Sequence, residues 1–217
     1  MSRDATARLF VAVDPPVSAC EQLVEWARGV GVSARAAGSS RGSLRLLDAH
    51  SLHLTLCFLG SRPVGEIQAL AAALAPCAEH ACELSIGAPL WLPPRRPHAL
   101  AVEIRDHEGE LQRMHARVSG ALSSVSGWHP ERRRYRPHIT LARVRRGAGG
   151  ARRTATGSTG GGADRSRSGR LPSEQSLPAT PRLSFMPEAI VLYRSWLTPE
   201  GATYEALASS ELVAAGR

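Results

Sequence analysis

Two short stretches of the chain share one pattern 85 positions apart: His53-Leu54-Thr55-Leu56 and His138-Ile139-Thr140-Leu141. Each stretch alternates polar and apolar residues, which is typical of a β-strand with one buried face. Because successive side chains of a strand point to opposite faces, the histidine and the threonine share one face while the two aliphatic side chains pack into a core. Two such strands side by side would present two imidazoles and two hydroxyls to one cleft.

A single His-Leu-Thr-Leu stretch is typical of an ordinary half-buried strand, and it is the second copy in a similar context that indicates catalysis. Histidine has an unperturbed pKa near 6.5, so at neutral pH it can act as an acid or as a base. The remaining histidines have no such repeat, and we expect them to be surface or structural residues: His50, His80, His98, His107, His115 and His129.

The length of 217 residues is enough for a sizeable core, arranged as one domain or two small lobes. No apolar run approaches the length that spans a membrane. The N-terminal apolar run at 9–13 is stopped by Asp14-Pro15-Pro16 and lacks the features of a secretory signal. We therefore expect a cytoplasmic protein, acting as a monomer without an obligate protein partner.

The formal net charge is +8, and all 27 basic residues are arginine. Arginine side chains suit phosphate recognition, which favours a polyanionic substrate. A lysine-free chain rich in alanine and arginine is also typical of GC-rich coding DNA, and seven of the arginines lie between Arg145 and Pro181. Global charge is therefore weak evidence for nucleic-acid binding.

The four cysteines, at 20, 57, 77 and 82, have no CxxC spacing, and we expect them to be reduced. Cys77, His80 and Cys82 could in principle ligate zinc, but no second ligand pair follows at a familiar spacing. A helix end followed by a strand fits this segment better. We predict neither a metal nor a cofactor.

Periodicity predicts an α+β fold. Strands are expected near 7–13, 44–47, 52–59, 83–91, 98–104, 137–144, 183–185, 189–196 and 204–208, and helices near 18–30, 64–78 and 110–124. Gly60 is expected to end the first histidine strand. The elements form two similar sets, each with one histidine strand. They predict two pseudo-symmetric lobes, each an antiparallel sheet with flanking helices, around a central cleft in one domain spanning 1–217.

The range 146–181 differs in character from the rest of the chain. It is dominated by Gly, Ser, Thr, Arg and Pro, includes Gly160-Gly161-Gly162, and contains almost no large apolar residue. Such a segment cannot bury enough apolar surface to offset its ordering entropy, so we predict a disordered insertion. The alternative is a basic arm that attracts RNA electrostatically.

Four segments carry a family resemblance: Arg8–Val13, Leu52–Gly60, Tyr135–Arg143 and Val191–Ser195. With these segments the sequence resembles the two-histidine phosphoesterase superfamily, and in particular the LigT-type RNA 2′,3′-cyclic phosphodiesterases. The resemblance covers the whole chain except the insertion. The paired motifs are specific to the superfamily, and the flanking residues favour the RNA phosphodiesterase branch.

The resemblance implies hydrolysis of a 2′,3′-cyclic phosphate at an RNA end to a 2′-phosphomonoester, with no metal. By matching motif positions, His53 would be the proton donor to the leaving 3′-oxygen and His138 the acceptor that activates water. Thr55 and Thr140 would bind the phosphate. The residues alone leave open which histidine is the acid and which the base.

Arg143 matches a family position that helps to hold the phosphate, yet strict alternation from His138 would point it away from the catalytic face. Either a β-bulge redirects its side chain or Arg143 serves elsewhere. Phe10 and Trp91 could stack on a terminal base or could be buried core aromatics.

Three other functions remain open. Members of the resembled family are associated with joining RNA ends through a 2′-5′ linkage, which is the reverse chemistry. A second option is a phosphodiesterase for small cyclic nucleotides. The third is an RNA-binding module without turnover, which would not need both histidines.

Overall fold

The structure is a computed structural model that describes residues 5–36, 44–144, 174–198 and 201–214. Its main element is a nine-stranded sheet in the order β10-β9-β1-β3-β7-β6-β5-β8, with β2 paired to β7. The strands are β1 (Thr6–Val13), β2 (Leu44–Leu46), β3 (Leu54–Pro63), β5 (Leu84–Leu92), β6 (Ala99–Asp106), β7 (His138–Val144), β8 (Ser184–Phe185), β9 (Ala189–Thr198) and β10 (Gly201–Glu211). A separate parallel pair joins β4 (His80–Ala81) to β11 (Val213–Ala214).

The large sheet divides into two halves at its centre, where β3 and β7 pair only through Leu54 and Ile139. One lobe contains β1, β3, β9 and β10, and the other contains β2 and β5 to β8. All the pairings in this sheet are antiparallel. The predicted α+β class with two antiparallel lobes is confirmed, and each lobe contributes one histidine strand to the junction.

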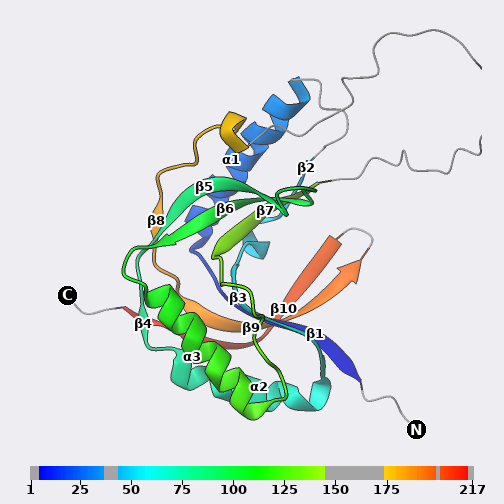
Figure 1. Ribbon diagram of the computed structural model, residues 1–217, viewed down its shortest axis with the longest axis vertical. Helices are drawn as coiled ribbons and strands as arrows, with labels where there is room; N and C mark the ends of the chain where they lie inside the picture. The colour runs from blue at the N-terminus through cyan, green and yellow to red at the C-terminus, as the bar shows by residue number, and fades with distance from the viewer. Residues whose placement is uncertain (1–4, 37–43, 145–173, 199–200, 215–217) are drawn as a thin grey trace, which may run out of the picture.

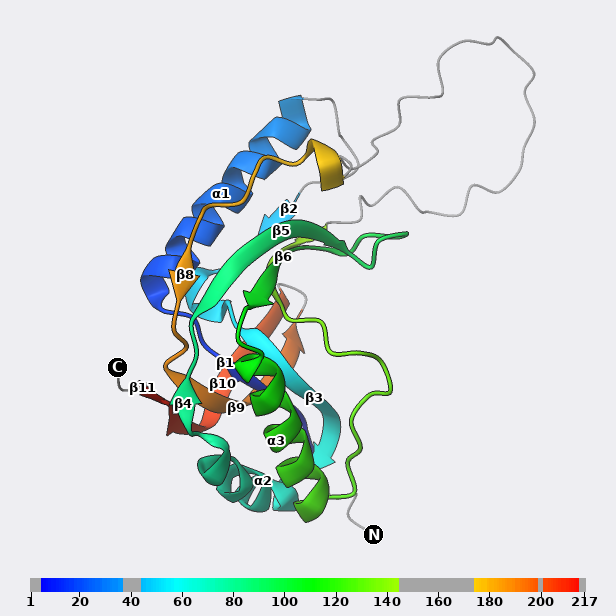
Figure 2. The same cartoon turned by 60° about the vertical axis from the view of Figure 1, so that its left-hand side comes forward.

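Three helices pack on the lobes: α1 (Val17–Ala36), α2 (Ile67–Leu74) and α3 (Glu110–Val125). Helix α1 follows β1 but contacts β2 and β7 of the other lobe, whereas α2 and α3 pack beneath β3, β9 and β10 (Figures 1 and 2). The aliphatic side chains of the histidine strands, Leu54, Leu56, Ile139 and Leu141, are buried in the core. The opposite face of the sheet is therefore left for the cleft.

Several predicted boundaries are wrong: the helix expected near 18–30 is α1, which continues to Ala36, and the strand expected near 204–208 is β10, Gly201–Glu211. Gly60 does not end β3, which continues to Pro63: Gly60 adopts a φ of 75°, and the register against β1 shifts beside it. Glycine tolerates this left-handed conformation, so the residue supports a β-bulge instead of a stop. The predicted helix 64–78 is α2 flanked by two short 3₁₀ segments, Val64–Glu66 and Ala75–Cys77.

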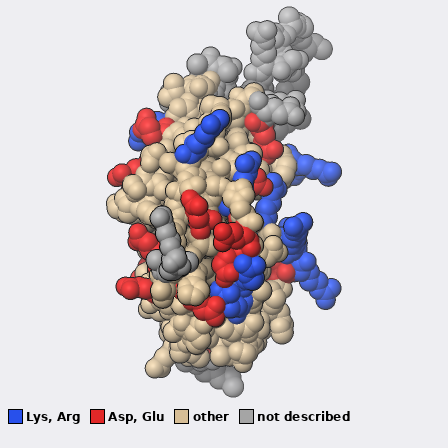
Figure 3. All heavy atoms as spheres, turned by 90° about the vertical axis from the view of Figure 1, so that its left-hand side faces the viewer, with Lys and Arg blue, Asp and Glu red and all other residues tan. Residues whose placement is uncertain are grey.

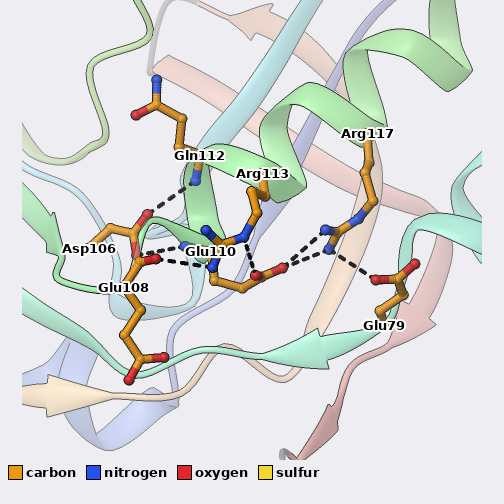
Figure 4. Close-up of polar contacts among 7 residues, drawn as sticks. All are labelled: Glu79, Asp106, Glu108, Glu110, Gln112, Arg113 and Arg117. Atoms are coloured by element: carbon orange, nitrogen blue, oxygen red, sulfur yellow. Dashed lines mark hydrogen bonds and ion pairs between the residues drawn. The ribbon is translucent and has the colours of Figure 1, made fainter.

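A polar network fixes the start of α3 (Figure 4). The Asp106 carboxylate accepts hydrogen bonds from the backbone N–H groups of Glu110 and Gln112, each at 3.1 Å. Glu110 in turn binds Arg113 at 2.7 Å and Arg117 at 3.0 Å. The carboxylate of Asp106 thereby satisfies helix donors that have no intrahelical partner. The network ties α3 to the end of β6.

Residues 146–173 of the predicted insertion lie outside the described residues, whereas 174–181 are packed against the body. The Glu174 carboxylate accepts from the backbone N–H of Trp91 at 2.8 Å, and the Thr180 hydroxyl donates to the carbonyl of Gly87 at 2.7 Å. The Trp26 indole donates to the carbonyl of Ala179 at 2.8 Å. The expectation of disorder is wrong for these residues because hydrogen bonds to β5 and α1 hold them and the side chain of Leu177 is buried in the core.

The cysteines are free and buried, and burial raises the pKa of the Cys57 and Cys82 thiols to about 11. The segment that could have held zinc is a helix end at Cys77 followed by β4, as preferred from the sequence. Across 5–36, 44–144, 174–198 and 201–214, no metal-binding group of three or more His, Cys, Asp or Glu side chains is present. In those same ranges no helix is long and apolar enough to cross a membrane.

Charge is unevenly distributed over the described surface. On the face in Figure 3, acidic and basic side chains lie side by side, while those that project furthest at the right-hand edge are basic. The net charge of the chain therefore does not describe this face.

Candidate active site

The five residues that the sequence singled out lie together. One cavity of about 340 Å³ at the junction of the lobes is lined by His53, Thr55, His138, Thr140 and Arg143. The two strands that carry them meet at the Leu54–Ile139 pair, and each of these residues directly follows a motif histidine. The narrow junction between the lobes therefore brings the two imidazoles into one site.

Both imidazoles are oriented by the same local hydrogen bond. The Nδ1 atom of His53 lies 2.9 Å from the carbonyl oxygen of Ser51, and that of His138 lies 2.8 Å from the carbonyl oxygen of Arg136. Because a carbonyl oxygen only accepts, Nδ1 of each ring must carry the hydrogen. This fixes the tautomer of the neutral imidazole and leaves its Nε2 atom without a hydrogen, so that Nε2 can accept a proton.

A β-bulge brings Arg143 into the site. The register of β7 against β6 shifts between Thr140 and Ala142, so Leu141 has no opposite residue. The extra residue reverses the alternation, and Arg143 returns to the face that carries His138. Of the two alternatives raised by the sequence, the bulge is the correct one.

The first motif contains the same irregularity. The register of β3 against β1 shifts between Thr55 and Cys57, which leaves Leu56 unopposed. Phe58 therefore occupies the position on β3 that Arg143 occupies on β7, five residues after the motif histidine. The guanidinium of Arg8 lies 4.5 Å from the centroid of the Phe58 ring. An arginine guanidinium therefore lies at or beside this position in each lobe: that of Arg143 on β7, and that of Arg8 next to Phe58 on β3.

His53 lies within an aromatic cluster that has no counterpart around His138 in the described structure. Its ring centroid is 4.7 Å from that of Phe10, 5.0 Å from that of Tyr204 and 6.1 Å from that of Tyr193. Burial lowers the pKa of His53 to about 4; the hydrogen bond to Ser51 opposes this shift, and the charges of Arg143 and His138 add to it. In the free protein His53 is neutral at pH 7.

The half-buried carboxylate of Asp14 anchors the cluster through Tyr193. The Tyr193 hydroxyl donates to Asp14 Oδ2 at 2.5 Å, and Tyr193 stacks on Phe10 with centroids 5.1 Å apart. Burial raises the pKa of Asp14, the Tyr193 hydrogen bond opposes this, and the charge of Glu188 adds to it. Asp14 thus holds Tyr193 in place, and Tyr193 in turn stacks on Phe10, which contacts His53.

Sequence reasoning missed two residues that line the cavity, Tyr204 and His98. His98 was expected to be a surface or structural histidine. It directly precedes Ala99, which pairs with Arg143 in the sheet. No pattern in the sequence signals that register. Phe10 and Trp91 are both 4% exposed, so they are core aromatics and do not offer a face to a base.

Comparison with known proteins places the chain in a family. The model of the 2′-5′ RNA ligase superfamily matches residues 15–155, which is more than half of the chain. The chain therefore belongs to the 2′-5′ RNA ligase superfamily, and the resemblance to LigT-like two-histidine phosphoesterases is confirmed.

Individual relatives are more distant. An RNA 2′,3′-cyclic phosphodiesterase of Aeropyrum pernix is 31% identical over 104 residues, which is 47% of this chain and 58% of that protein. The chain thus matches somewhat over half the length of this curated relative.

Two solved structures share the fold. TT0787 of Thermus thermophilus has a TM-score of 0.68 at 24% identity, covering 94% of this chain and 97% of that one. LigT of E. coli, complexed with 3′-AMP, has a TM-score of 0.67 at 21% identity, covering 96% and 99%. These likenesses concern the fold.

Proposed function

We propose that this protein hydrolyses RNA ends that carry a 2′,3′-cyclic phosphate to 2′-phosphomonoesters by general acid–base catalysis. The observation that carries the proposal is the meeting of His53 and His138, from separate lobes, in the lining of one cavity with two threonines and an arginine. In-line displacement at phosphorus needs a base beside the attacking water and an acid beside the departing oxygen, on opposite sides.

The proposed proton transfers use the Nε2 atoms of the two histidines. His138 accepts a proton from the attacking water while the water oxygen forms its bond to phosphorus. His53 gives a proton to the ribose 3′-oxygen as the bond from phosphorus to that oxygen breaks. The hydroxyls of Thr55 and Thr140 and the guanidinium of Arg143 would bind the non-bridging oxygens, where negative charge grows in the transition state.

The donor role of His53 requires that substrate binding changes its protonation. A donor must carry a proton at Nε2 when the substrate is bound, yet the pKa of His53 in the free protein is about 4. A phosphodiester anion in the cavity would favour the charged imidazole and raise this pKa. Proton uptake with substrate is therefore part of the proposal.

The choice of RNA is supported by the relatives. The matched Aeropyrum pernix protein is an RNA 2′,3′-cyclic phosphodiesterase, and the similar LigT structure of E. coli contains 3′-AMP. Ligation through a 2′-5′ linkage would use the same groups in reverse.

The deciding experiment incubates the protein with an oligoribonucleotide ending in a 2′,3′-cyclic phosphate, in excess chelator, and identifies the product. We expect a 2′-phosphate and a free 3′-hydroxyl. A 3′-phosphate product would reverse the leaving group, and a strict need for a divalent ion would overturn the metal-free mechanism. A longer RNA formed after addition of an acceptor with a free 5′-hydroxyl would indicate ligation, and turnover of small cyclic nucleotides alone would indicate a different substrate.

A further inference from the structure

A second cavity of about 340 Å³ adjoins the catalytic one. It lies between β3, helix α3 and the segment 128–138 that leads into β7. Thr55, Leu92 and His138 line both cavities. A polymer whose end lies at the histidines can therefore continue directly into the second cavity.

The segment leading into β7 gives the second cavity a positive lining. Arg133, Arg134 and Arg136 line it and are exposed, against a single acidic residue in the lining, Glu131. In the part of the chain that the structure describes, none of the three arginines forms an ion pair. Unpaired guanidinium groups in a concave site suit a phosphate, which they can bind through two parallel hydrogen bonds.

The same cavity offers an aromatic surface. The Phe58 side chain lines it and is 40% exposed, with Arg8 stacked on the ring at 4.5 Å. The rings of His115 and Tyr135 also line it and stack with centroids 4.1 Å apart and planes 7° apart. Aromatic rings interleaved with arginines are the means by which proteins bind single-stranded nucleic acids, with bases on the rings and phosphates on the cations.

Hydrogen bonds fix the segment 133–136 relative to both histidine strands. The Tyr135 hydroxyl donates to the carbonyl of Thr55 at 3.1 Å, and the carbonyl of Arg136 accepts from the imidazole of His138. The arginines of the second cavity are therefore tied to both histidine strands. A ligand that spans both cavities would meet a preformed surface.

We propose that this second cavity, the arginine pocket lined by Phe58, Arg133, Arg134 and Arg136, binds the nucleotide on the 5′ side of the reacting end. The inference rests on the proposed function. A cyclic phosphate occupies both the 2′- and the 3′-oxygen of the terminal ribose, so the strand can extend only from its 5′-oxygen. The next phosphate would contact the arginines, and the next base would stack on Phe58.

The test compares two substrates with the double variant Arg133→Ala/Arg134→Ala. Arg136 is left intact because it lies two residues before His138 and its backbone carbonyl orients that imidazole, so that an effect of the double variant is not confused with displacement of the catalytic histidine. For an oligoribonucleotide with a cyclic phosphate we expect kcat/KM to fall roughly 10- to 100-fold, because charged hydrogen bonds are lost. For a nucleoside 2′,3′-cyclic phosphate, which has no 5′ neighbour, kcat/KM should stay within about twofold of wild type. The salt dependence for the oligonucleotide should also become shallower by about one charge per arginine.

Arg28→Ala is the matched control, because Arg28 lies exposed on α1 and, among the described residues, forms an ion pair with Glu25 alone. It should leave both substrates unaffected. Equal losses on both substrates would place the terminal nucleoside in the arginine pocket and overturn the inference. The absence of a loss on either substrate would also overturn it.

A second readout separates this inference from the proposed function. Fluorescence anisotropy with a single-stranded oligoribonucleotide ending in a 2′-phosphate measures binding without turnover. Wild-type protein that cleaves neither substrate would refute the proposed function, while weaker binding by the double variant would still support the pocket. Unchanged RNA binding together with unchanged kinetics would instead mean that the arginines serve another partner, such as an acidic protein.

Discussion

The two histidine strands, β3 and β7, are alike in backbone and different in surroundings. Each carries a histidine, a threonine two residues later, and a β-bulge directly after the threonine. Each imidazole donates from Nδ1 to the carbonyl two residues before it. The repeat therefore extends beyond the motif to the hydrogen bonds that orient the imidazoles and to the bulge that redirects the side chains after the threonine.

The difference comes from the neighbouring strands. Phe10 of β1, Tyr193 of β9 and Tyr204 of β10 surround His53, and its hydrogen bond is partly buried, whereas that of His138 is exposed. Five residues after the histidine, β7 presents Arg143 and β3 presents Phe58. Two equal motifs are thus made chemically unequal by residues elsewhere in the chain. Because these surroundings favour the neutral imidazole of His53, its proposed role as the acid depends on a proton taken up with the substrate.

The largest effect should follow loss of either imidazole. We expect His53→Ala and His138→Ala each to lower kcat on a cyclic-phosphate RNA by roughly 10³-fold or more, since an acid or base and its positioning are both lost. His107→Ala is the control: His107 is an exposed histidine bonded to Ser85 at 3.1 Å, outside the lining of the catalytic cavity. Near-normal turnover in either motif variant, measured by product chromatography, would refute the assignment.

The position five residues after each histidine offers a second contrast. Arg143→Ala should reduce kcat/KM by roughly 10²-fold on both oligonucleotide and mononucleotide substrates, because a cation beside the phosphate is lost. Phe58→Ala should affect the oligonucleotide alone, and by less. Steady-state kinetics with both substrates would show it. If Arg143→Ala has no more effect than Phe58→Ala on the mononucleotide, the bulge on β7 does not serve the phosphate.

The proposed donor role of His53 can be tested with sulfate, an anion that does not itself titrate between pH 5 and 8. A bound anion raises the pKa of His53 above its free value of about 4, so binding takes up a proton and the affinity increases as the pH falls. We expect up to about tenfold tighter binding per pH unit by calorimetry. In His53→Gln this dependence should weaken. An unchanged dependence in that variant would argue against His53 as the donor.

Much of this site follows from local sequence, and the rest depends on register. The alternation around His53 and His138 predicted both strands, and their repetition predicted the two lobes. Local alternation could not predict the bulge that turns Arg143, because an unpaired Leu141 depends on how β6 aligns beside it. Tyr204 likewise joins His53 only through the pairing of β10 with β9 and of β9 with β1.

The smallest expected effect concerns the aromatic cluster. Tyr204→Ala should let water reach the imidazole of His53, so its pKa should rise from about 4 toward the ordinary value near 6.5, by roughly one unit. Titration of the histidine side chains by NMR would measure this change. Tyr204→Phe keeps the ring and should leave the pKa unchanged. If Tyr204→Ala also leaves it unchanged while Arg143→Ala raises it, the positive charges rather than burial lower the pKa of His53.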